Sequence, residues 1–382
     1  MKILHVLAPA PFGGLERVVQ DLTRAQAGAG HDVRVVAVGQ VESDVGPFHA
    51  SLAGEVEVRP LLLPVRAYLR ERKTVEEIGR EWEADVRHTH GYRADVVHAG
   101  AGGGSGTGTV GTVSTVHGFT TSGATTGHPL TVGTVKNRLY EWLQCRAYRR
   151  VGAAVAVSRA LGRDLRRRGV PPERLHVIPN ALAEPDFLER DEAREALEVD
   201  AAAFHVGWVG RLGPEKGPDL FLEALRRMDV LERCRVSVVG SGSLEGELRR
   251  FSVEHGLEPS VRFLGPVEGA ARLFRGFDLL VMSSRTEGTP IVLLEAMAAG
   301  APLVTTAVGG IPDVVSDREA LLVPPDDPPA LARAMEAVFH DPEGARERAR
   351  RARARFERDR NPSDWVERYD EVYEEVRSKP RP

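Results

Sequence analysis

The chain has 382 residues, of which 42% are hydrophobic and 28% are charged, and its net charge is -4 at pH 7. This length favours two domains of roughly 100–200 residues each, and the near-balanced charge excludes a strong electrostatic case for a nucleic-acid partner. No apolar run approaches the ~20 residues that a membrane-spanning helix needs. The start, Met1–Leu7, is typical of a strand rather than a signal peptide. Cys145 and Cys234 lie far apart, as reduced thiols do in a cytosolic protein, so we expect a cytoplasmic location.

In the first half of the chain, short apolar runs alternate with segments of helical periodicity. The expected strands are 3–7, 33–38, 86–89, 110–116, 153–157 and 175–178, and the expected helices are 15–27, 75–82, 136–149 and 159–168. Such alternation predicts a parallel sheet with helices on both faces. The segments 99–111 and 119–134 are rich in Gly, Thr and Ser, which indicates either a surface loop or a mobile lid.

The pattern restarts after Pro179 and the polar segment 183–200, which we interpret as a linker. The expected strands are 206–209, 236–239, 261–264, 279–282 and 303–305, and the expected helices are 219–228, 244–255, 291–299 and 330–339. The sequence therefore predicts an α/β protein of two Rossmann-like, doubly wound domains, residues 1–180 and 181–362. Ligands of such sheets bind at the carboxyl ends of the strands. A last helix within residues 363–382 either stays with the second domain or crosses back onto the first.

Two glutamates, Glu287 and Glu295, flank the start of the predicted helix 291–299. Glu287 lies on the loop after strand 279–282, and we expect Glu295 about two turns into the helix. Between them, the first helix amides have no intrahelical partner and form a natural site for phosphate. An anion site beside carboxylates that can bind hydroxyl groups suits a nucleotide sugar.

Two cations, Arg211 and Lys216, follow the strand 206–209 on one loop, five positions apart. Arg can hold a phosphate in bidentate fashion and Lys binds it as a point charge, so together they can bracket a diphosphate. The chain has no Asp-x-Asp motif, the usual anchor of a divalent metal on a nucleotide diphosphate. We therefore expect cations and helix amides, and no metal, to balance the charge of the ligand.

Features of the first half are less specific. The run Gly13–Glu16 lies between the first strand and the first helix but fits neither GxGxxG nor a P-loop. His117 follows the strand 110–116. At this position the sequence allows either a structural role or a place in the binding cleft. His88 and His90 share one face of a strand. Their spacing can bind zinc, but no third and fourth ligands accompany them in a recognisable pattern, so we favour cleft-lining or packing roles.

Basic residues gather near the end of the first half. They form either a solvated charged face or a peripheral docking site for anionic lipid on the inner side of the membrane. The residues are Arg146, Arg149, Arg150, Arg163, Arg166, Arg167 and Arg168.

Taken together and in order, nine runs resemble the retaining, GT-B-fold glycosyltransferases of family 4 over nearly the whole chain. The runs are Gly13–Glu16, His88–Gly91, Val116–Gly118, Val157–Arg159, Ile178–Asn180, Val209–Gly217, Phe263–Gly265, Glu287–Glu295 and Ala307–Pro312. The last two are the most specific.

This resemblance implies a GT-B fold, with two domains facing across a cleft. It also implies metal-independent, retaining transfer of a hexose from a UDP- or GDP-linked donor to a lipid-carrier, polysaccharide or small-molecule acceptor, with no further cofactor. Two alternatives stay open: a nucleotide-sugar epimerase or hydrolase of the same architecture, and a non-catalytic nucleotide-sugar binder.

The resemblance further implies a role for each site residue. The expected catalytic residues are His117, at the distal hydroxyl of the donor sugar, Glu287, near its reacting centre, and Arg211 and Lys216, on the diphosphate. The expected donor-binding set adds Gly14, Val267 near the nucleobase, the backbone at Gly288, Thr289, Pro290 and Ile291, and Glu295 on the ribose.

Overall fold

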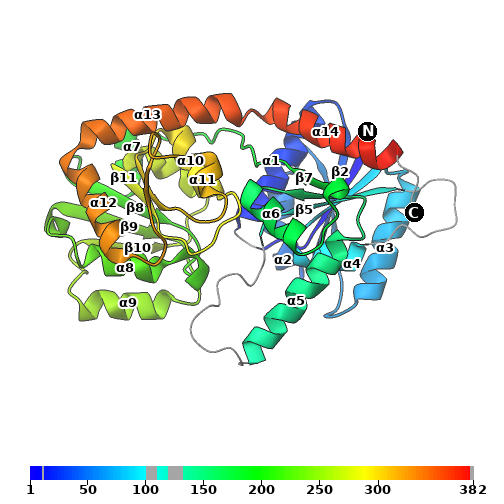
Figure 1. Ribbon diagram of the computed structural model, residues 1–382, viewed down its shortest axis with the longest axis horizontal. Helices are drawn as coiled ribbons and strands as arrows, with labels where there is room; N and C mark the ends of the chain where they lie inside the picture. Colours follow the sequence, from blue (N-terminus) through cyan, green and yellow to red (C-terminus); the bar gives the residue numbers. More distant parts are fainter. Residues whose placement is uncertain (11–12, 100–109, 119–131, 379–382) are drawn as a thin grey trace. The chain divides into compact units, whose positions relative to one another are not determined.

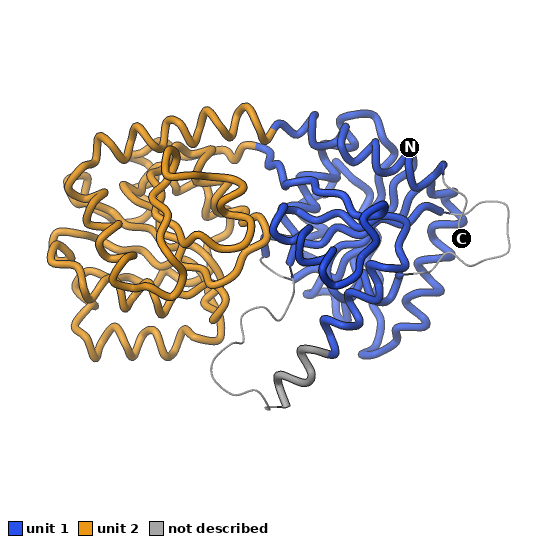
Figure 2. Tube along the Cα trace, viewed as in Figure 1, with its two compact units in different colours: residues 1–121, 127–183, 361–382 blue, residues 122–126, 184–360 orange. Residues whose placement is uncertain are grey.

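The computed structural model describes residues 1–10, 13–99, 110–118 and 132–378, with only the backbone for 132–138. The Gly- and Thr-rich segments 99–111 and 119–134 lie largely outside these residues. The described chain divides into two compact units (Figure 2). Unit 1 holds the described residues up to 183 together with 361–378, and unit 2 holds residues 184–360. Each unit is built on one parallel sheet flanked by helices (Figure 1), which confirms the predicted α/β class with two Rossmann-like parts.

Among the described residues of unit 1, seven strands form a parallel sheet in the order β3-β2-β1-β4-β5-β6-β7. The strands are β1 (Lys2–Leu7), β2 (Asp32–Gly39), β3 (Glu57–Leu62), β4 (Val86–His90), β5 (Gly111–Val116), β6 (Ala153–Ala156) and β7 (Leu175–Val177). The helices are α1 (Gly14–Gly28), α2 (Glu42–Ser51), α3 (Tyr68–Glu81), α4 (Tyr92–His98), α5 (Val132–Tyr148), α6 (Arg159–Arg167) and α14 (Pro362–Ser378), with a short 3₁₀ turn η1 (Pro172–Arg174).

Within residues 184–360, six strands form a second parallel sheet in the order β10-β9-β8-β11-β12-β13. The strands are β8 (Phe204–Val209), β9 (Cys234–Val239), β10 (Val261–Gly265), β11 (Leu279–Met282), β12 (Leu303–Thr306) and β13 (Leu321–Val323). The helices are α7 (Arg190–Ala196), α8 (Pro218–Leu225), α9 (Glu245–Glu254), α10 (Ile291–Ala299), α11 (Ile311–Val314), α12 (Pro328–His340) and α13 (Pro342–Asp359). Shorter 3₁₀ segments are η2 (Pro214–Lys216), η3 (Leu231–Arg233) and η4 (Ala270–Gly276).

Both sheets reverse their strand order at one point. In unit 1 the reversal lies between β1 and β4, and in unit 2 it lies between β8 and β11. Loops from these neighbouring strands leave toward opposite faces of the sheet and open a crevice at the carboxyl ends, where doubly wound proteins bind ligands. The residues that follow β8 and β11 are therefore the first place to look for a site.

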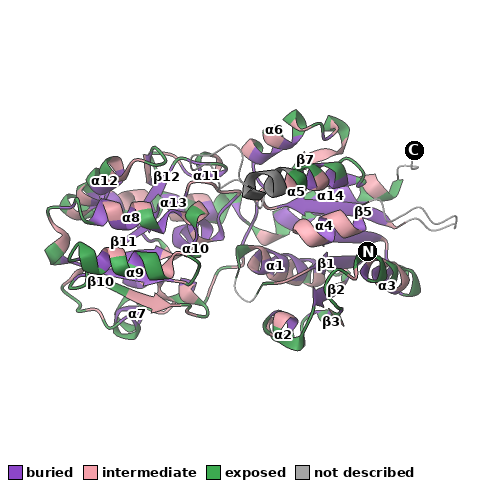
Figure 3. Ribbon diagram, turned by 90° about the horizontal axis from the view of Figure 1, so that it is seen from below, coloured by how far each residue is buried: buried purple, intermediate pink, exposed green. Residues whose placement is uncertain are grey.

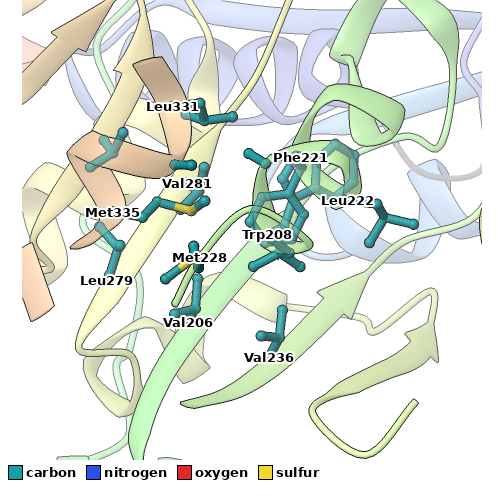
Figure 4. Close-up of a cluster of buried hydrophobic side chains, with 14 of the residues drawn as sticks. Val206, Trp208, Phe221, Leu222, Met228, Val236, Leu279, Val281, Leu331 and Met335 are labelled. Carbon is teal, nitrogen blue, oxygen red and sulfur yellow. The ribbon is translucent and has the colours of Figure 1, made fainter. Parts of the chain in front are cut away.

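Buried residues gather on the central strands of each unit (Figure 3). In unit 2, Trp208 on β8 lies beside Phe221 on α8, and Val281 of β11 and Met335 of α12 join the same cluster (Figure 4). All four are at most 2% exposed. Strands covered on both faces read as continuous apolar runs, which explains why the central strands were predicted correctly from the sequence.

The last helix, α14, packs in unit 1 against α1 and β5. Its buried face is aromatic, with Trp365, Tyr369 and Tyr373 each at most 3% exposed. Within the described residues, no helix is both long and apolar enough to cross a bilayer.

The interpretation of 183–200 as a plain linker was wrong for its middle. Residues 190–196 form α7, and the buried guanidinium of Arg194 donates hydrogen bonds to Asp278 and to the carbonyls of Asp200 and Ala203. A polar segment of this kind looks like a linker in the sequence, because the contact of Arg194 with Asp278 spans 84 positions and no local pattern shows it.

Candidate active site

The loops after β8 and β11 meet through an ion pair between Lys216 and Glu287. The Nζ atom of Lys216 donates to both carboxylate oxygens of Glu287, at 2.7 and 2.8 Å. The Glu287 side chain is 6% exposed and the Lys216 side chain is 29% exposed. The pair therefore lies at the reversal point of the second sheet, with the carboxylate inside and the ammonium group reachable from solvent.

Serine and threonine hydroxyls fasten the two loops to each other. Ser284 donates to Glu287 Oε1 at 2.7 Å. The hydroxyl of Ser283 accepts from the indole of Trp208 at 3.0 Å and donates to the carbonyl of Gly217 at 2.6 Å. Thr306, at the end of β12, donates to the carbonyl of Ser284 at 2.6 Å. These buried hydrogen bonds hold Lys216 and Glu287 in place before any ligand arrives.

Arg285 is a second fastening that sequence reasoning missed. Its guanidinium donates to both carboxylate oxygens of Asp219 at 2.8 and 2.6 Å, to Asp326 at 2.7 Å and to the carbonyl of Pro214 at 2.8 Å. Its backbone N–H donates to the carbonyl of Glu215 at 2.9 Å. Its position two residues before Glu287 was the available signal, but the side-chain partners of Arg285 lie more than 40 residues away and no local pattern identifies them.

Two glycines allow these loops to approach closely. Gly217 has φ +62°, and a Cβ there would lie 2.1 Å from the carbonyl oxygen of Ser283. Gly309 has φ +53°, and a Cβ there would lie 1.8 Å from the carbonyl oxygen of Glu287. Any other residue would have to push the loop away, so both glycines are needed for the position of the ion pair.

Helix α10 begins beside Glu287. Gly288, Thr289 and Pro290 lead into the helix, whose first residue is Ile291, and Pro290 occupies the N-cap position without a side-chain cap. The first amides of α10 are consequently not consumed by a capping side chain, as an anion site requires. Glu295 is half-buried and follows Ile291 by four positions, so it lies just over one turn into the helix rather than the two turns expected.

The other predicted residues of unit 2 lie at the same edge of its sheet. Arg211 follows β8, is 70% exposed and pairs with Glu215 at 2.7 Å, while Val267 is half-buried just after β10. Both sit beyond the carboxyl end of their strand, as Lys216 and Glu287 do. Gly14 and His117 belong to unit 1. That they form one site with the residues of unit 2 stays a prediction.

In unit 1, Gly14 is the first residue of α1, and the carboxylate of Glu16 accepts a hydrogen bond from the N–H of Ala10 at 2.7 Å. His117 follows β5 and is half-buried, and burial lowers its pKa to about 4. Its Nε2 atom lies 3.3 Å from Nδ1 of His90. His117 is therefore a neutral imidazole at pH 7, held by a second histidine.

A third histidine, His5 on β1, completes a cluster with His88 and His90. Ring nitrogens of these three buried residues lie within 4.8 Å of one another, which is close enough to hold a metal ion. However, Nδ1 of His5 lies 2.9 Å from Nε2 of His90, and the two nearly parallel rings have centroids 5.2 Å apart, so these nitrogens point at each other and not at a shared ion. All six ring nitrogens also have hydrogen-bond partners. We therefore assign hydrogen bonding, and not metal ligation, to this cluster.

A cavity of about 460 Å³ opens at the opposite edge of the unit 2 sheet. It is lined by Phe204 at the start of β8, by Phe277 just before β11, and by the segment before β12. Ligands of doubly wound sheets bind at the other edge, so the cavity is separate from the candidate active site.

Comparison with known families fits this geometry. The model described as "Glycosyltransferase Family 4" matches residues 12–183, and the one described as "Glycosyl transferases group 1" matches residues 203–341. The chain belongs to the family 4 glycosyltransferases. The second match covers the loops that carry Arg211, Lys216 and Glu287.

Curated relatives of this family 4 glycosyltransferase match over part of their length. A D-inositol 3-phosphate glycosyltransferase of Geodermatophilus obscurus is 35% identical over 223 residues, which are 54% of this chain and 50% of that protein. The lipopolysaccharide core biosynthesis mannosyltransferase LpsB of Rhizobium meliloti is 34% identical over 206 residues, 50% of this chain and 57% of that protein. The chain thus spans about half the length of these relatives.

Solved structures share the fold over nearly the full length. Sucrose-phosphate synthase from Thermosynechococcus elongatus aligns with a TM-score of 0.83 at 20% identity, over 98% of this chain and 99% of that chain. HepE of Anabaena in complex with UDP-glucose aligns with a TM-score of 0.82 at 23% identity, over the same shares of the two chains. These likenesses support the GT-B fold of this family 4 glycosyltransferase.

Proposed function

We propose that this family 4 glycosyltransferase moves a hexose from a UDP- or GDP-linked donor to an acceptor, with retention of anomeric configuration and without a metal. The observation that carries the proposal is the Lys216–Glu287 ion pair, set at the reversal point of the unit 2 sheet beside the start of α10. Cation, carboxylate and helix amides are the groups that a sugar diphosphate needs.

The charges suit a diphosphate. An ammonium group has three N–H donors, and Lys216 uses two contacts on Glu287. Lys216 can therefore bind the diphosphate of a sugar nucleotide through its remaining N–H group while Glu287 stays paired with it. Arg211 reaches from its exposed position, and the amides at the start of α10 add partial positive charge. These groups can balance the diphosphate, so we propose that no divalent metal is required.

The remaining roles follow from position. Glu287 would contact the donor sugar near its reacting carbon, Glu295 the ribose, Val267 the nucleobase and His117 a distal sugar hydroxyl. As the bond to the diphosphate breaks, negative charge grows on the leaving oxygens, where Arg211 and Lys216 stabilise it. The departing phosphate then takes the proton of the acceptor hydroxyl as that oxygen bonds to the sugar from the same face. This route retains the anomeric configuration.

The names of relatives and neighbours support the donor class. Among them are a mannosyltransferase, an alpha-D-kanosaminyltransferase of Streptomyces kanamyceticus and HepE in complex with UDP-glucose. Their names also include a lipopolysaccharide core enzyme and a D-inositol 3-phosphate enzyme. We therefore propose a glycan, lipid-linked or small-molecule acceptor, with a place in polysaccharide biosynthesis as one use.

The test is acceptor dependence. Donor cleavage by the purified protein should be slow alone and should rise when the correct acceptor is added, and NMR of the product should show the anomeric configuration of the donor. EDTA should leave the rate intact. Donor turnover at full rate without acceptor would instead identify the epimerase or hydrolase alternative, and strict dependence on magnesium or manganese would contradict the metal-free proposal.

We also propose a cytoplasmic location with peripheral membrane contact. On α5, Leu139 and Trp142 are 53% and 54% exposed, and the guanidinium of Arg146 lies 5.5 Å from the Trp142 ring. Apolar and basic side chains at this spacing fit the surface of an anionic bilayer. Flotation with anionic vesicles should carry the protein, and Trp142→Ala should weaken it. Equal flotation with neutral vesicles, or none, would leave α5 a solvated face.

A further inference from the structure

A continuous hydrogen-bonded network of polar side chains, which we call the histidine file, runs through unit 1 from the half-buried His117 to the last helix. His117 contacts His90 at 3.3 Å, His90 contacts His5 at 2.9 Å, and His5 contacts the amide oxygen of Gln26 at 2.8 Å. The amide nitrogen of Gln26 donates to the hydroxyl of Tyr373 at 2.9 Å. The file thus joins the candidate catalytic histidine to α14.

The file continues on the far side of Tyr373. Its hydroxyl lies 2.7 Å from Nδ1 of His88, and Nε2 of His88 lies 2.7 Å from the hydroxyl of Thr115. That hydroxyl in turn lies 2.9 Å from the hydroxyl of Tyr369, also on α14. Each hydroxyl and ring nitrogen on this branch, from Tyr373 through His88 and Thr115 to Tyr369, therefore has a partner within hydrogen-bond distance.

Each link of the file fixes the proton of the next. A neutral imidazole carries one N–H donor and one acceptor nitrogen. The amide oxygen of Gln26 can only accept, so the proton of His5 is on Nε2 and its Nδ1 accepts from Nε2–H of His90. Nδ1 of His90 then accepts from Nε2–H of His117. The proton of His117 consequently points inward, and its Nδ1 atom is an acceptor.

The other branch obeys the same rule. Because the hydroxyl of Tyr373 accepts from Gln26, its own proton goes to Nδ1 of His88. His88 therefore carries its proton on Nε2 and donates to Thr115. All four histidines take the Nε2–H tautomer, and one amide decides this for both branches.

We propose that Gln26 is a positioning residue that fixes the tautomer of His117 through His5 and His90. If the amide turned over, its NH₂ group would face His5, and every proton of the file would move to the other nitrogen. Both orders satisfy all hydrogen bonds, so the amide selects between them. Burial supports this mechanism, because it lowers the pKa of His5 to about 4 and keeps the rings neutral at pH 7.

The consequence lies at the outer end of the file. With its proton on Nε2, His117 presents Nδ1 as an acceptor, which is the form that a ligand hydroxyl needs. The expected effect on turnover rests on the proposed function. The tautomers do not, since they are measured in the free protein.

The first test uses the unaltered protein, labelled with ¹⁵N-histidine. Nitrogen shifts and their couplings to ring protons distinguish the two neutral tautomers and the charged ring, and single-histidine variants assign the signals. We expect His5, His88, His90 and His117 all to be Nε2–H at pH 7. Rings that differ in tautomer, or that carry a charge, would overturn the proposal.

The second test breaks the file at two links. Gln26→Met removes the acceptor of His5, so the proton of His5 should move to Nδ1, and those of His90 and His117 should follow. His5→Phe breaks the next link and should change His90 and His117 in the same way, which keeps the test valid if one variant does not fold. A His117 that stays Nε2–H in each variant that folds would contradict a role for Gln26.

A matched control is available in Gln144→Met. Gln144 is also buried, at 3% exposure, and its amide donates to the hydroxyl of Tyr148 at 2.6 Å, outside the file. This variant should leave the His117 tautomer unchanged, and the same change in it would refute the specific path. With donor and acceptor present, Gln26→Met should lower kcat about tenfold, the factor for one lost hydrogen bond. Predicted tautomers without any transferase activity would refute the proposed function and leave this inference standing.

Discussion

Lys216 carries the heaviest chemical demand of any single residue, because it would face the negative charge that grows on the leaving diphosphate. Lys216→Ala should lower kcat by about two to three orders of magnitude, the scale seen when one charge stabiliser of a transition state is removed. Lys73→Ala is the control, since Lys73 is 79% exposed on α3 of unit 1. A loss of less than threefold in Lys216→Ala would remove this residue from the diphosphate site.

Arg211 offers a sharper comparison, because unit 2 contains a second Arg–Glu ion pair of the same sequence spacing on α9. Arg211 pairs with Glu215 and Arg249 pairs with Glu245, each four positions away, and both arginine side chains are exposed. Arg211→Ala should reduce kcat/KM about 10- to 100-fold, the value of hydrogen bonds to a charged group, whereas Arg249→Ala should change it little. Equal effects of the two variants would show that Arg211 acts only as a surface charge.

The sequence predicted where these residues lie along the sheet, but not which side chains they contact. Arg211, Lys216 and Glu287 could be placed because each follows an apolar strand, and strand ends of a parallel sheet share one edge. The bidentate contact of Lys216 with Glu287 spans 71 positions, and nothing local encodes it. The third histidine, His5, was missed for the same reason: it stands opposite His88 only once β1 and β4 pair.

At the scale of elements, the loop after β12 holds Glu287 in position. Gly309→Ala would place a Cβ 1.8 Å from the Glu287 carbonyl oxygen, so the loop must shift in addition to the cost of a positive φ. Gly300→Ala is the control, because Gly300 has φ +70° with no atom within 4 Å of the added Cβ. We expect about 1 kcal/mol of destabilisation for Gly300→Ala and about 2–4 kcal/mol for Gly309→Ala, measured by urea unfolding. If both variants lost the same free energy of unfolding, the close approach of Gly309 to Glu287 would not contribute to stability.

Elements that the sequence did not predict share a physical cause. Strand β3 contains Pro60 and alternates charged with apolar residues, which only an edge strand tolerates. Helix α2 contains Gly46 and Pro47, both poor helix formers, and is held by packing of Val45 and Phe48. In both cases tertiary contacts outweigh local propensity, so the local pattern misleads.

For the whole molecule, the histidine file predicts a loss of stability in acid. Burial lowers the pKa of His5 and His117 to about 4, and those of His88 and His90 well below the ordinary value of 6.5. Below pH 6.5 the unfolded chain binds these protons and the folded chain does not, so the free energy of unfolding falls as pH falls toward 4. Asp95 acts in the opposite direction, because burial raises its pKa to about 7.

The change in the free energy of unfolding with pH follows from these pKa values. Between pH 7 and pH 5, His5 and His117 should each remove about 2 kcal/mol of stability, and Asp95 should return about 2 kcal/mol. These three groups give a net loss of about 2 kcal/mol. His88, His90 and His205, whose pKa values burial also lowers, add to this loss, which urea unfolding at each pH measures. A free energy of unfolding that stays constant or rises from pH 7 to pH 5 would contradict neutral buried histidines.

The most direct measurement for the donor site is thermal unfolding with nucleotide diphosphates and their sugars. A donor present at 100 times its Kd should stabilise the protein by about 2.7 kcal/mol and raise the Tm by several degrees. The same compound should give little or no shift in Lys216→Ala, while Lys73→Ala should respond as the unaltered protein does. The contrary result would be that no nucleotide diphosphate or nucleotide sugar raises the Tm, or that Lys216→Ala is protected as fully as the unaltered protein.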